Sequence, residues 1–363
     1  MLAEPKTLAA LLVIGLLPGC ATMGGRHAAS HKEFLSPAER KTAIQRAEVW
    51  HQTPVAEMNL RVGPGGDGSF TQGQTVTCDY VKENFGGTSP KFGCAISKDD
   101  VVKVKYGRNN GEVYAGVAAT RLLWALGFGA DAMYPVQVVC RGCPASLADG
   151  DQVASNALRF DVAAIERKMA GHDMETKSGP GWAWPELDGV NAGAEEQQPQ
   201  RDALKLLAVM LQHTDSKTEQ QRLLCEDDKG HGHDLAKCKT PFMMVHDVGQ
   251  TFGTANRFNR TSIGSVNLTG WAHTPVWKDA KRCVGNLSKS QTGTLVDPTI
   301  SEAGRAFLAD LLTALSDQQI RDLFDVAQFA KRPDADGHGT SVDDWVQAFR
   351  SKRQEIVDAR CPS

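Results

Sequence analysis

The most informative segment of the sequence is Gln212-His213-Thr214-Asp215-Ser216-Lys217-Thr218-Glu219-Gln220. Immediately before it, residues 202–212 carry apolar side chains at helical spacing, which predicts an amphipathic helix. After it, residues 222–225 and 241–246 are short apolar runs, which predict two strands. The polar segment therefore joins a predicted helix to a predicted strand pair, and it is the first candidate for a functional loop.

A second polar motif, His246-Asp247-Val248-Gly249, stands at the end of this strand pair. Asp247 follows Asp215 by 32 residues, of which 12 lie between Cys225 and Cys238, leaving an interval of 20. In this order and at this spacing, the two segments resemble the catalytic loop of protein kinases, His-Arg-Asp-x-Lys-Pro-Glu-Asn, and their Asp-Phe-Gly motif. The continuation Gly249-Gln250-Thr251-Phe252-Gly253 resembles the Asp-Asn-Gly-x-x-Phe-Gly segment of the secretory-pathway casein kinases, an atypical exported branch.

The resemblance implies an α+β, two-lobed protein-kinase-like fold with a sheet-rich N-lobe and a helical C-lobe. It also implies ATP-dependent phosphoryl transfer to a hydroxyl-bearing acceptor, with Mg²⁺ or Mn²⁺ as the metal cofactor. By the matched positions, Asp215 is the catalytic base, Lys217 steadies the transferring phosphoryl group and Asp247 binds the metal. Gln220 takes the place of the second metal ligand, where the family has Asn. Its amide oxygen also coordinates hard cations, one methylene further out.

A predicted hairpin in the N-terminal half carries two lysines on one face. Its strands are residues 91–96 and 101–106. Lys103 and Lys105 project from the same face, because successive side chains alternate across a strand. The resemblance implies that Lys105 binds the ATP phosphates, with Lys103 as the second choice.

The predicted hairpin is followed by an apolar helix, residues 112–126, which begins with Glu112. Glu112 is the only acidic residue between Gly111 and Leu126, and the resemblance implies that it is the carboxylate partner of the lysine. An acid in the first helical turn is also favoured by the helix dipole alone. The glycine-rich residues 63–68 lack the glycine order of a phosphate-binding loop and are interpreted as a flexible loop.

Two other functional classes fit the same residues. A pseudokinase or binding lipoprotein would keep the fold without catalysis, and Gln220 in place of Asn favours it. A kinase-fold AMP-transferase would move a different part of the nucleotide. Taken singly, each motif also has a structural explanation: Asp215 as a turn cap, Lys217 as a solvated side chain and residues 247–249 as a strand-ending turn. Their combination in one order favours the kinase-like interpretation.

The N-terminus predicts export and a lipid anchor. Lys6 precedes an apolar run, residues 8–17, which is too short to span a bilayer but suits a signal peptide. Leu17-Pro18-Gly19-Cys20 resembles the lipobox of bacterial lipoproteins, which predicts acylation of Cys20 after cleavage. We therefore expect an exported protein, periplasmic or on the cell surface, whose lipid attaches it to a bacterial membrane. The net charge of −3 does not favour a nucleic-acid partner.

The expected organisation has four parts: a signal peptide at 1–19, a lipid-anchored tether at 20–45, the N-lobe at 46–165 and the C-lobe at 166–363. Within the C-lobe, residues 171–201 are rich in Gly, Pro, Gln and Glu and are predicted as a long loop. Trp182 and Trp184 are expected to attach this loop to the body of the protein.

Eight cysteines follow Cys20, and an even number in an exported chain favours disulfides. Pairing of sequential neighbours predicts four bridges, Cys78–Cys94, Cys140–Cys143, Cys225–Cys238 and Cys283–Cys361. The Cys140–Cys143 pair has the spacing of a redox motif, but no helix is predicted to begin there, so a structural bridge is preferred. Cys225, His231, His233 and Cys238 are an alternative zinc site, which an oxidising compartment disfavours.

Overall fold

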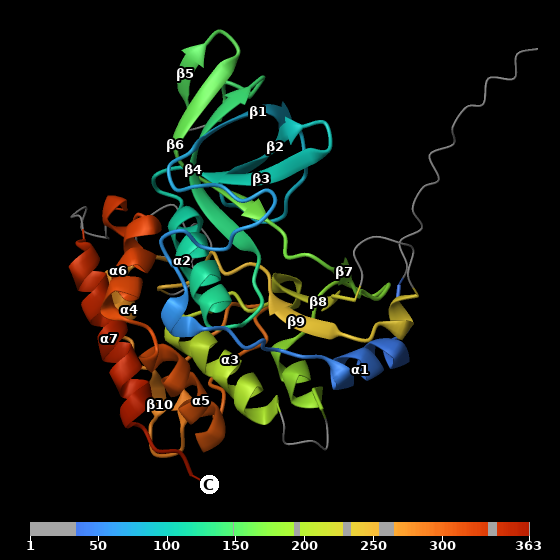
Figure 1. Ribbon diagram of the computed structural model, residues 1–363, viewed down its shortest axis with the longest axis vertical. Helices are drawn as coiled ribbons and strands as arrows, with labels where there is room; N and C mark the ends of the chain where they lie inside the picture. The colour runs from blue at the N-terminus through green and yellow to red at the C-terminus, as the bar shows by residue number, and fades with distance from the viewer. Residues whose placement is uncertain are drawn as a thin grey trace, which may run out of the picture. The chain divides into compact units, whose positions relative to one another are not determined.

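Residues 34–147, 149–191, 197–227, 234–253, 265–332 and 340–362 are described by the computed structural model. Within them the architecture is α+β, with a sheet-rich region followed by a helical region, consistent with a two-lobed protein-kinase-like fold (Figure 1). The predicted fold class is confirmed. The predicted signal peptide and Cys20 lie outside the described residues.

Six strands form the sheet of the N-terminal region, in the order β3-β2-β1-β4-β6-β5. Their bounds are β1 (Thr75–Val81), β2 (Lys91–Ser97), β3 (Asp100–Tyr106), β4 (Ala132–Arg141), β5 (Asp151–Ala154) and β6 (Ala157–Arg167). β1 and β4 are parallel, and the other neighbouring pairs are antiparallel. β3 also pairs with β6, so the sheet curls back on itself. Phe92, Val104 and Phe160 belong to the buried cluster that this curl encloses.

One long helix, α2 (Gly111–Ala125), packs against this sheet and connects it to the helical region (Figure 1). Asn110 caps the helix: its Oδ1 accepts a hydrogen bond from the N–H of Glu112 at 3.2 Å. Its Nδ2 donates to the carbonyl of Pro90 at 3.1 Å, which ties the cap to the end of the β1–β2 connection. Every residue of α2 except Trp124 is buried, because the helix contacts β4, β6 and α6. The cap thereby fixes the position of Glu112 beside the sheet.

The C-terminal region consists mainly of helices. The helices besides α2 are α1 (Pro37–Arg46), α3 (Gln198–Leu211), α4 (Leu268–His273), α5 (Glu302–Thr313), α6 (Asp317–Val326) and α7 (Val342–Asp358). α3 packs against α5, and α7 contacts α4, α5 and α6. Phe252, Trp271, Phe324, Phe329 and Trp345 form a buried aromatic cluster, with contacting ring centroids 4.7 to 6.4 Å apart. Phe252 belongs to the segment after Asp247, so the cluster anchors that segment.

A second sheet, in the order β7-β8-β9, brings the two polar motifs together. Its strands are β7 (His172–Asp173), β8 (Gln221–Cys225) and β9 (Pro241–Val245); β10 (Trp277–Asp279) and β11 (Val284–Gly285) pair separately. β8 and β9 are antiparallel, with Gln221 opposite Val245. The segment that contains Asp215 precedes β8, and Asp247 follows β9. Their closeness is therefore set by the hairpin register.

Two segments predicted to lack regular structure, the loop at 171–201 and the tether at 20–45, contain secondary structure among the described residues. The described part of residues 171–201, predicted as a long loop, contains β7, a 3₁₀ turn at Trp184–Gly189 and the beginning of α3. Trp182 and Trp184 are buried, as expected for side chains that attach this segment to the body. Helix α1 lies within and just beyond the range predicted as a tether.

All four predicted disulfide pairs are confirmed. The Cα–Cα distances are 5.5 Å for Cys78–Cys94, 5.7 Å for Cys140–Cys143, 5.8 Å for Cys225–Cys238 and 5.3 Å for Cys283–Cys361. Four such pairs are compatible with an oxidising location outside the cytoplasm. The bridge between Cys225 and Cys238 takes both thiols from the alternative zinc site, whose histidines lie outside the described residues. Among the described helices, none has the length and apolar character to cross a bilayer.

Candidate functional site

Lys105 lies between two carboxylates that come from different elements. Its Nζ is 3.0 Å from Oε2 of Glu112 in the first turn of α2, and 3.1 Å from Oδ1 of Asp247 after β9. The Lys105 side chain is 1% exposed. Burial opposes the charge of a lysine, but the carboxylates of Asp247 and Glu112 raise the pKa of Lys105 well above its usual value. The predicted lysine–glutamate pair is present, and Asp247 completes a triad.

Asp247 is ionised in this triad. Burial favours the neutral form of a carboxyl group, but the positive charges of Lys105 and Lys103 hold the pKa of Asp247 well below its usual range. Its Oδ1 also accepts a hydrogen bond from the N–H of Gly249 at 3.1 Å. A Cβ at Gly249 would lie 2.9 Å from Cβ and Cγ of Glu112, so glycine allows this loop to approach α2 closely.

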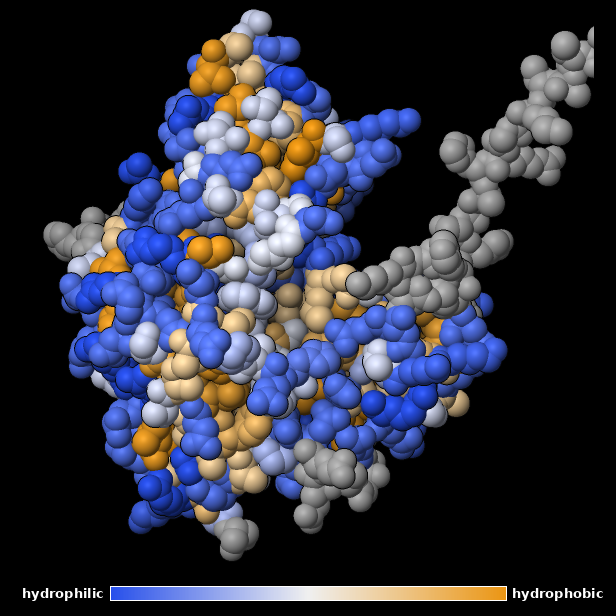
Figure 2. Space-filling model, viewed as in Figure 1, coloured by the Kyte–Doolittle hydropathy of each residue, from blue (hydrophilic) through white to orange (hydrophobic). Residues whose placement is uncertain are grey.

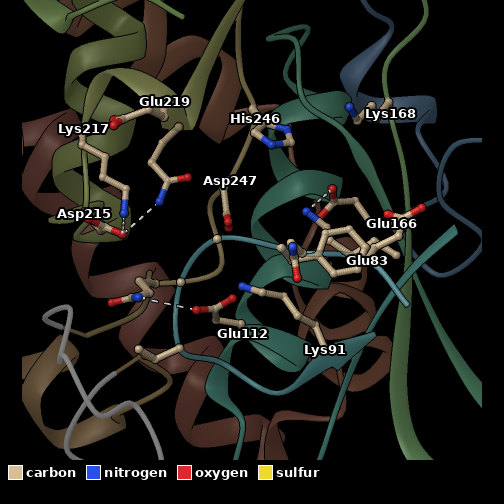
Figure 3. A pocket seen from close by; sticks show the side chains of 18 of the residues that line it. Glu83, Lys91, Glu112, Glu166, Lys168, Asp215, Lys217, Glu219, His246 and Asp247 are labelled. Carbon is tan, nitrogen blue, oxygen red and sulfur yellow. Dashed lines mark hydrogen bonds and ion pairs between the residues drawn. The ribbon is translucent and has the colours of Figure 1, made fainter. Parts of the chain in front are cut away.

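Asp215 faces the same cavity from the segment between α3 and β8. Its Oδ2 accepts a hydrogen bond from Nε2 of Gln220 at 2.9 Å and lies 3.4 Å from Nζ of Lys217. Its Oδ1 accepts from Oγ of Ser290 at 3.2 Å. Figure 3 shows Asp215 and Lys217 close together on one side of Asp247, with Glu112 further along the cavity wall.

The backbone of Gln220 joins the two polar motifs. Its carbonyl oxygen accepts hydrogen bonds from the N–H of His246 at 2.7 Å and from the N–H of Asp247 at 3.1 Å. Gln220 ends a 3₁₀ turn that leads directly into β8. The amide side chain of the same residue contacts Asp215. Gln220 therefore fixes the spacing between Asp215 and Asp247 through both its backbone and its side chain.

A cavity of about 1280 Å³ contains most of the predicted site residues. Those that line it are Lys103, Glu112, Asp215, Lys217, Gln220 and Asp247. Lys105 lies behind this wall and reaches it through its pairs with Glu112 and Asp247. On the face in Figure 2 the surface is mainly hydrophilic, and a notch separates the sheet-rich region from the part with α1 and β7 to β9. The predicted carboxylates thus converge on one space large enough for a nucleotide.

Lys103, the second choice for the phosphate-binding lysine, has a different partner. Its Nζ lies 2.5 Å from Oε1 of Glu166 on β6, the strand that pairs with β3. It lines the cavity but forms no pair with Glu112 among the described contacts. The geometry therefore distinguishes the two lysines, and Lys105 alone joins the sheet to Glu112 and Asp247.

A cluster of Asp131, Glu166 and His246 lies beside the cavity, which Glu166 and His246 line, and its ligand atoms are all within 4.8 Å of one another. Nδ1 of His246 is 2.6 Å from Oδ2 of Asp131, and Nη1 of Arg222 is 3.3 Å from the other oxygen of Asp131. Glu166 is neutralised by Lys103. Because cations of the protein already balance both carboxylates, the cluster is explained as an ion-pair network at the end of the cavity.

Several cavity residues are not predicted from the sequence. The β1–β2 connection, residues 83–88, lines the cavity with Gly86 and Gly87, together with Lys91 and Ser290. The signal was available, because Gly86-Gly87-Thr88-Ser89-Pro90 immediately precedes the first strand of the predicted hairpin. The other glycine-rich run, residues 63–68, does not line the cavity, although the carbonyl of Gly68 accepts a hydrogen bond at 2.9 Å from Arg167, which does.

His213 is a buried member of the motif rather than a cavity residue. It is 2% exposed, and its ring centroid lies 6.0 Å from that of Trp184. Neither ring nitrogen has a hydrogen-bond partner among the described residues. Burial lowers the pKa of His213 to about 4, against the opposing influence of Asp215 and Asp247, so the ring is neutral near pH 7.

The donor atoms in the cavity fit a hard divalent cation. Asp247 supplies a carboxylate oxygen, and Gln220 supplies an amide oxygen because its nitrogen is the atom that donates to Asp215. Mg²⁺ and Mn²⁺ prefer such oxygen ligands. Within the described chain, Oδ2 of Asp247 has no hydrogen-bond partner, whereas Oδ1 accepts from Lys105 and Gly249. One oxygen of Asp247 is therefore available for a ligand.

No known family model matches the sequence, and no curated protein matches it significantly. Among solved structures, the crystal structure of the proinflammatory kinase CtkA of Helicobacter pylori is similar. The alignment covers 79% of this chain and 95% of CtkA, with a TM-score of 0.37 and 10% sequence identity. Similarity at this level assigns no activity to this chain.

Proposed function

We propose that this protein is an ATP-dependent phosphotransferase that acts outside the cytoplasm on a hydroxyl-bearing acceptor. The observation that carries the proposal is the triad of Lys105, Glu112 and Asp247, whose two carboxylates line the same cavity as Asp215. Phosphoryl transfer needs a cation near the phosphates, a metal ligand and a carboxylate near the acceptor hydroxyl. These groups come from three separate segments of the chain and converge at one place.

Each residue has a role that follows from its surroundings. Asp247 and the amide oxygen of Gln220 would hold Mg²⁺ or Mn²⁺, which supplies charge neutralisation at the phosphates. Lys105, oriented by Glu112, would contact the phosphates of the nucleotide. Asp215 would accept the proton of the acceptor hydroxyl, and Lys217 would stabilise negative charge on the transferred group.

The proposed location is the outer side of a bacterial membrane, with Cys20 as the lipid attachment site. The lipobox-like sequence supports this proposal, and the four disulfide pairs are compatible with it. Mass spectrometry of the protein purified from a bacterial membrane tests it. The expected result is an N-terminal peptide that starts at Cys20 and carries acyl chains. An unmodified N-terminus elsewhere contradicts the lipid anchor.

A transfer assay tests the catalytic proposal directly. The full chain is incubated with γ-labelled ATP and Mg²⁺ or Mn²⁺, with the chain itself and casein as hydroxyl-bearing acceptors. The wild type is expected to transfer the label, and Asp247→Ala is expected to lose transfer. Asp99→Ala, an exposed aspartate in the β2–β3 turn, is the matched control. Equal signals from wild type and Asp247→Ala contradict the proposal. AMP transfer releases the γ-label with pyrophosphate, so the mass of the product is also measured, and a mass increase of adenylate instead of phosphate assigns the protein to the AMP-transferases.

A nucleotide-binding protein without transfer is the second candidate. The contact between Gln220 and Asp215 favours it, because the amide N–H occupies an oxygen of the residue proposed as the base. Two results together would support this second candidate. The wild type would bind nucleotide in a metal-dependent way without any transfer, and Gln220→Asn would gain transfer. Asn is one methylene shorter and would release Asp215 while keeping an amide oxygen near Asp247.

A further inference from the structure

A turn of the chain at residues 290–293, shortly after β11, forms part of the cavity wall. The N–H of Gly293 donates to the carbonyl of Ser290 at 3.0 Å, which closes the turn. Ser290, Gln291 and Thr292 line the cavity. Gln291 and Thr292 are exposed, whereas Ser290 is partly buried. The turn therefore brings two hydroxyl groups to the cavity, and their surroundings differ.

The turn is fixed to the segment that contains Asp215 by hydrogen bonds of the main chain. The N–H of Ser290 donates to the carbonyl of Thr214 at 2.8 Å, and the N–H of Thr294 donates to the carbonyl of Ser216 at 3.0 Å. Oγ1 of Thr294 donates to the same carbonyl at 2.8 Å. Thr214 and Ser216 are the two sequence neighbours of Asp215, so the backbone sets the position of Ser290 beside Asp215.

The hydroxyl group of Ser290 contacts the carboxylate proposed as the catalytic base. Its Oγ donates to Oδ1 of Asp215 at 3.2 Å. The other oxygen of Asp215 accepts from Nε2 of Gln220 at 2.9 Å and lies 3.4 Å from Nζ of Lys217. A base has to lie within about 2.6–3.2 Å of the hydroxyl oxygen whose proton it accepts. Ser290 therefore has the contact with Asp215 that an acceptor hydroxyl needs.

The same hydroxyl group lies in the cavity where the nucleotide is proposed to bind. Asp215, Asp247 and Ser290 all line that cavity. Gln220 joins the first two, because its carbonyl accepts from the N–H of Asp247 at 3.1 Å and its side chain donates to Asp215. A metal-bound triphosphate at Asp247 would place its terminal phosphate in the same space as the hydroxyl of Ser290.

We propose that Ser290 is the acceptor of a phosphoryl transfer within its own chain. This inference rests on the proposed function and names one acceptor hydroxyl for it. Oγ of Ser290 forms a bond to the γ-phosphorus of ATP, while the bond from that phosphorus to the oxygen that bridges it to the β-phosphorus breaks. Asp215 accepts the proton of the hydroxyl group, and the products are phosphoserine and ADP.

Mass spectrometry of the full chain tests the acceptor directly. The wild type is treated with a phosphatase, separated from it and incubated with ATP and Mg²⁺, and tandem mass spectrometry of its peptides then locates each phosphate. One phosphate is expected on Ser290, and none at this position in Ser290→Ala or Asp247→Ala. Ser290→Thr keeps a hydroxyl group and is expected to be modified at the same position. Ser288→Ala is the matched control, because Ser288 is an exposed serine of the same segment.

The dependence on protein concentration tests whether the transfer is intramolecular. The half-time of phosphorylation at Ser290 is expected to stay constant as the concentration changes, because the donor site and the acceptor belong to one chain. A second arm mixes the wild type with isotopically labelled Asp247→Ala. The labelled variant is expected to remain unmodified, and phosphate on its Ser290 overturns the inference because it shows transfer between molecules.

The outcomes distinguish this inference from the proposed function. Phosphorylated casein together with unmodified Ser290 overturns the role of Ser290 and leaves the phosphotransferase proposal standing. Phosphate found only at other positions of the chain has the same meaning. Absence of phosphate from both casein and the chain overturns both.

Discussion

Nζ of Lys105 and Oδ1 of Asp247 lie 3.1 Å apart, although 142 positions separate the two residues in the chain. Glu112 completes the contact at 3.0 Å from the same nitrogen. The triad therefore joins three segments of the chain: β3, the beginning of α2, and the loop after β9, which is far from the other two in the sequence. One ammonium group contacts two carboxylates, so each member depends on the other two.

Replacement of Lys105 by Met is expected to destabilise the protein by about 3–5 kcal/mol, because it removes the ammonium group that contacts both the buried carboxylate of Glu112 and the partly buried carboxylate of Asp247. Chemical denaturation of the oxidised protein measures the free energy of unfolding. The double variant Lys105→Met with Glu112→Gln is expected to recover part of the loss, since one of the uncompensated charges is gone. If the loss in the double variant equals the sum of the losses in Lys105→Met and Glu112→Gln, the two residues are not coupled.

Replacement of Gly249 by Ala is expected to displace Glu112, because the added Cβ would stand 2.9 Å from two of its side-chain carbons. The orientation of Lys105 depends on that carboxylate, so ATP-dependent transfer should fall on the order of tenfold to a hundredfold. Gly65→Ala is the matched control, because a Cβ at Gly65 has no heavy atom within 4 Å. Equal transfer rates in the two variants would contradict the importance of this close approach.

His213 is expected to make the protein sensitive to acid. Burial lowers its pKa to about 4, whereas the unfolded chain has the ordinary histidine value near 6.5. Between these values the unfolded state binds more protons, so stability falls as the pH is lowered from about 6.5 towards 4, by up to about 3 kcal/mol. His213→Phe retains an aromatic ring that does not titrate.

The measurement is the free energy of unfolding of both proteins at several pH values across that window. The wild type should lose more stability than His213→Phe on acidification, and the difference isolates histidine from the carboxylates that titrate in the same range. Parallel losses in the two proteins would show that His213 is protonated in the folded state or exposed to water.

The disulfides should differ in their contribution to stability according to the loop that each one closes. Cys283 and Cys361 are 78 residues apart, whereas Cys140 and Cys143 are 3 apart. Chain entropy predicts a loss of about 4.5 kcal/mol when the longer bridge is removed by double substitution to Ala, and about 1.5 kcal/mol for the shorter one. Denaturation midpoints of the two double variants test this order, and a larger loss from the Cys140–Cys143 pair would contradict it.

The sequence predicted those parts of the fold whose side-chain pattern is regular. Strands β2 and β3, helices α2 and α3 and the two strands β8 and β9 follow from apolar runs, alternation or helical spacing, and the disulfides follow from neighbour pairing. β6 was missed because Arg159, Asp161 and two central alanines interrupt its apolar pattern. Those alanines become buried only through the pairing of β6 with β3 and β4, which is a tertiary effect.

The candidate site was predictable where short motifs have a fixed order, as at Asp215 and Asp247. The choice between Lys103 and Lys105 needed the structure, because alternation places both on one face and only the partners differ. Lys91 was missed for a related reason. Its position opposite Lys105 and at the cavity depends on the hairpin register.

The most direct test of the central claim is the affinity of the full chain for ATP with Mg²⁺ and with the metal removed by a chelator. We predict that Mg²⁺ tightens binding by about tenfold or more in the wild type, because Asp247 holds the metal at the phosphates. Asp247→Asn should lose this metal dependence, and the control Asp99→Asn should keep it. Absence of ATP binding in the wild type, or equal affinity with and without metal in every variant, would contradict the account.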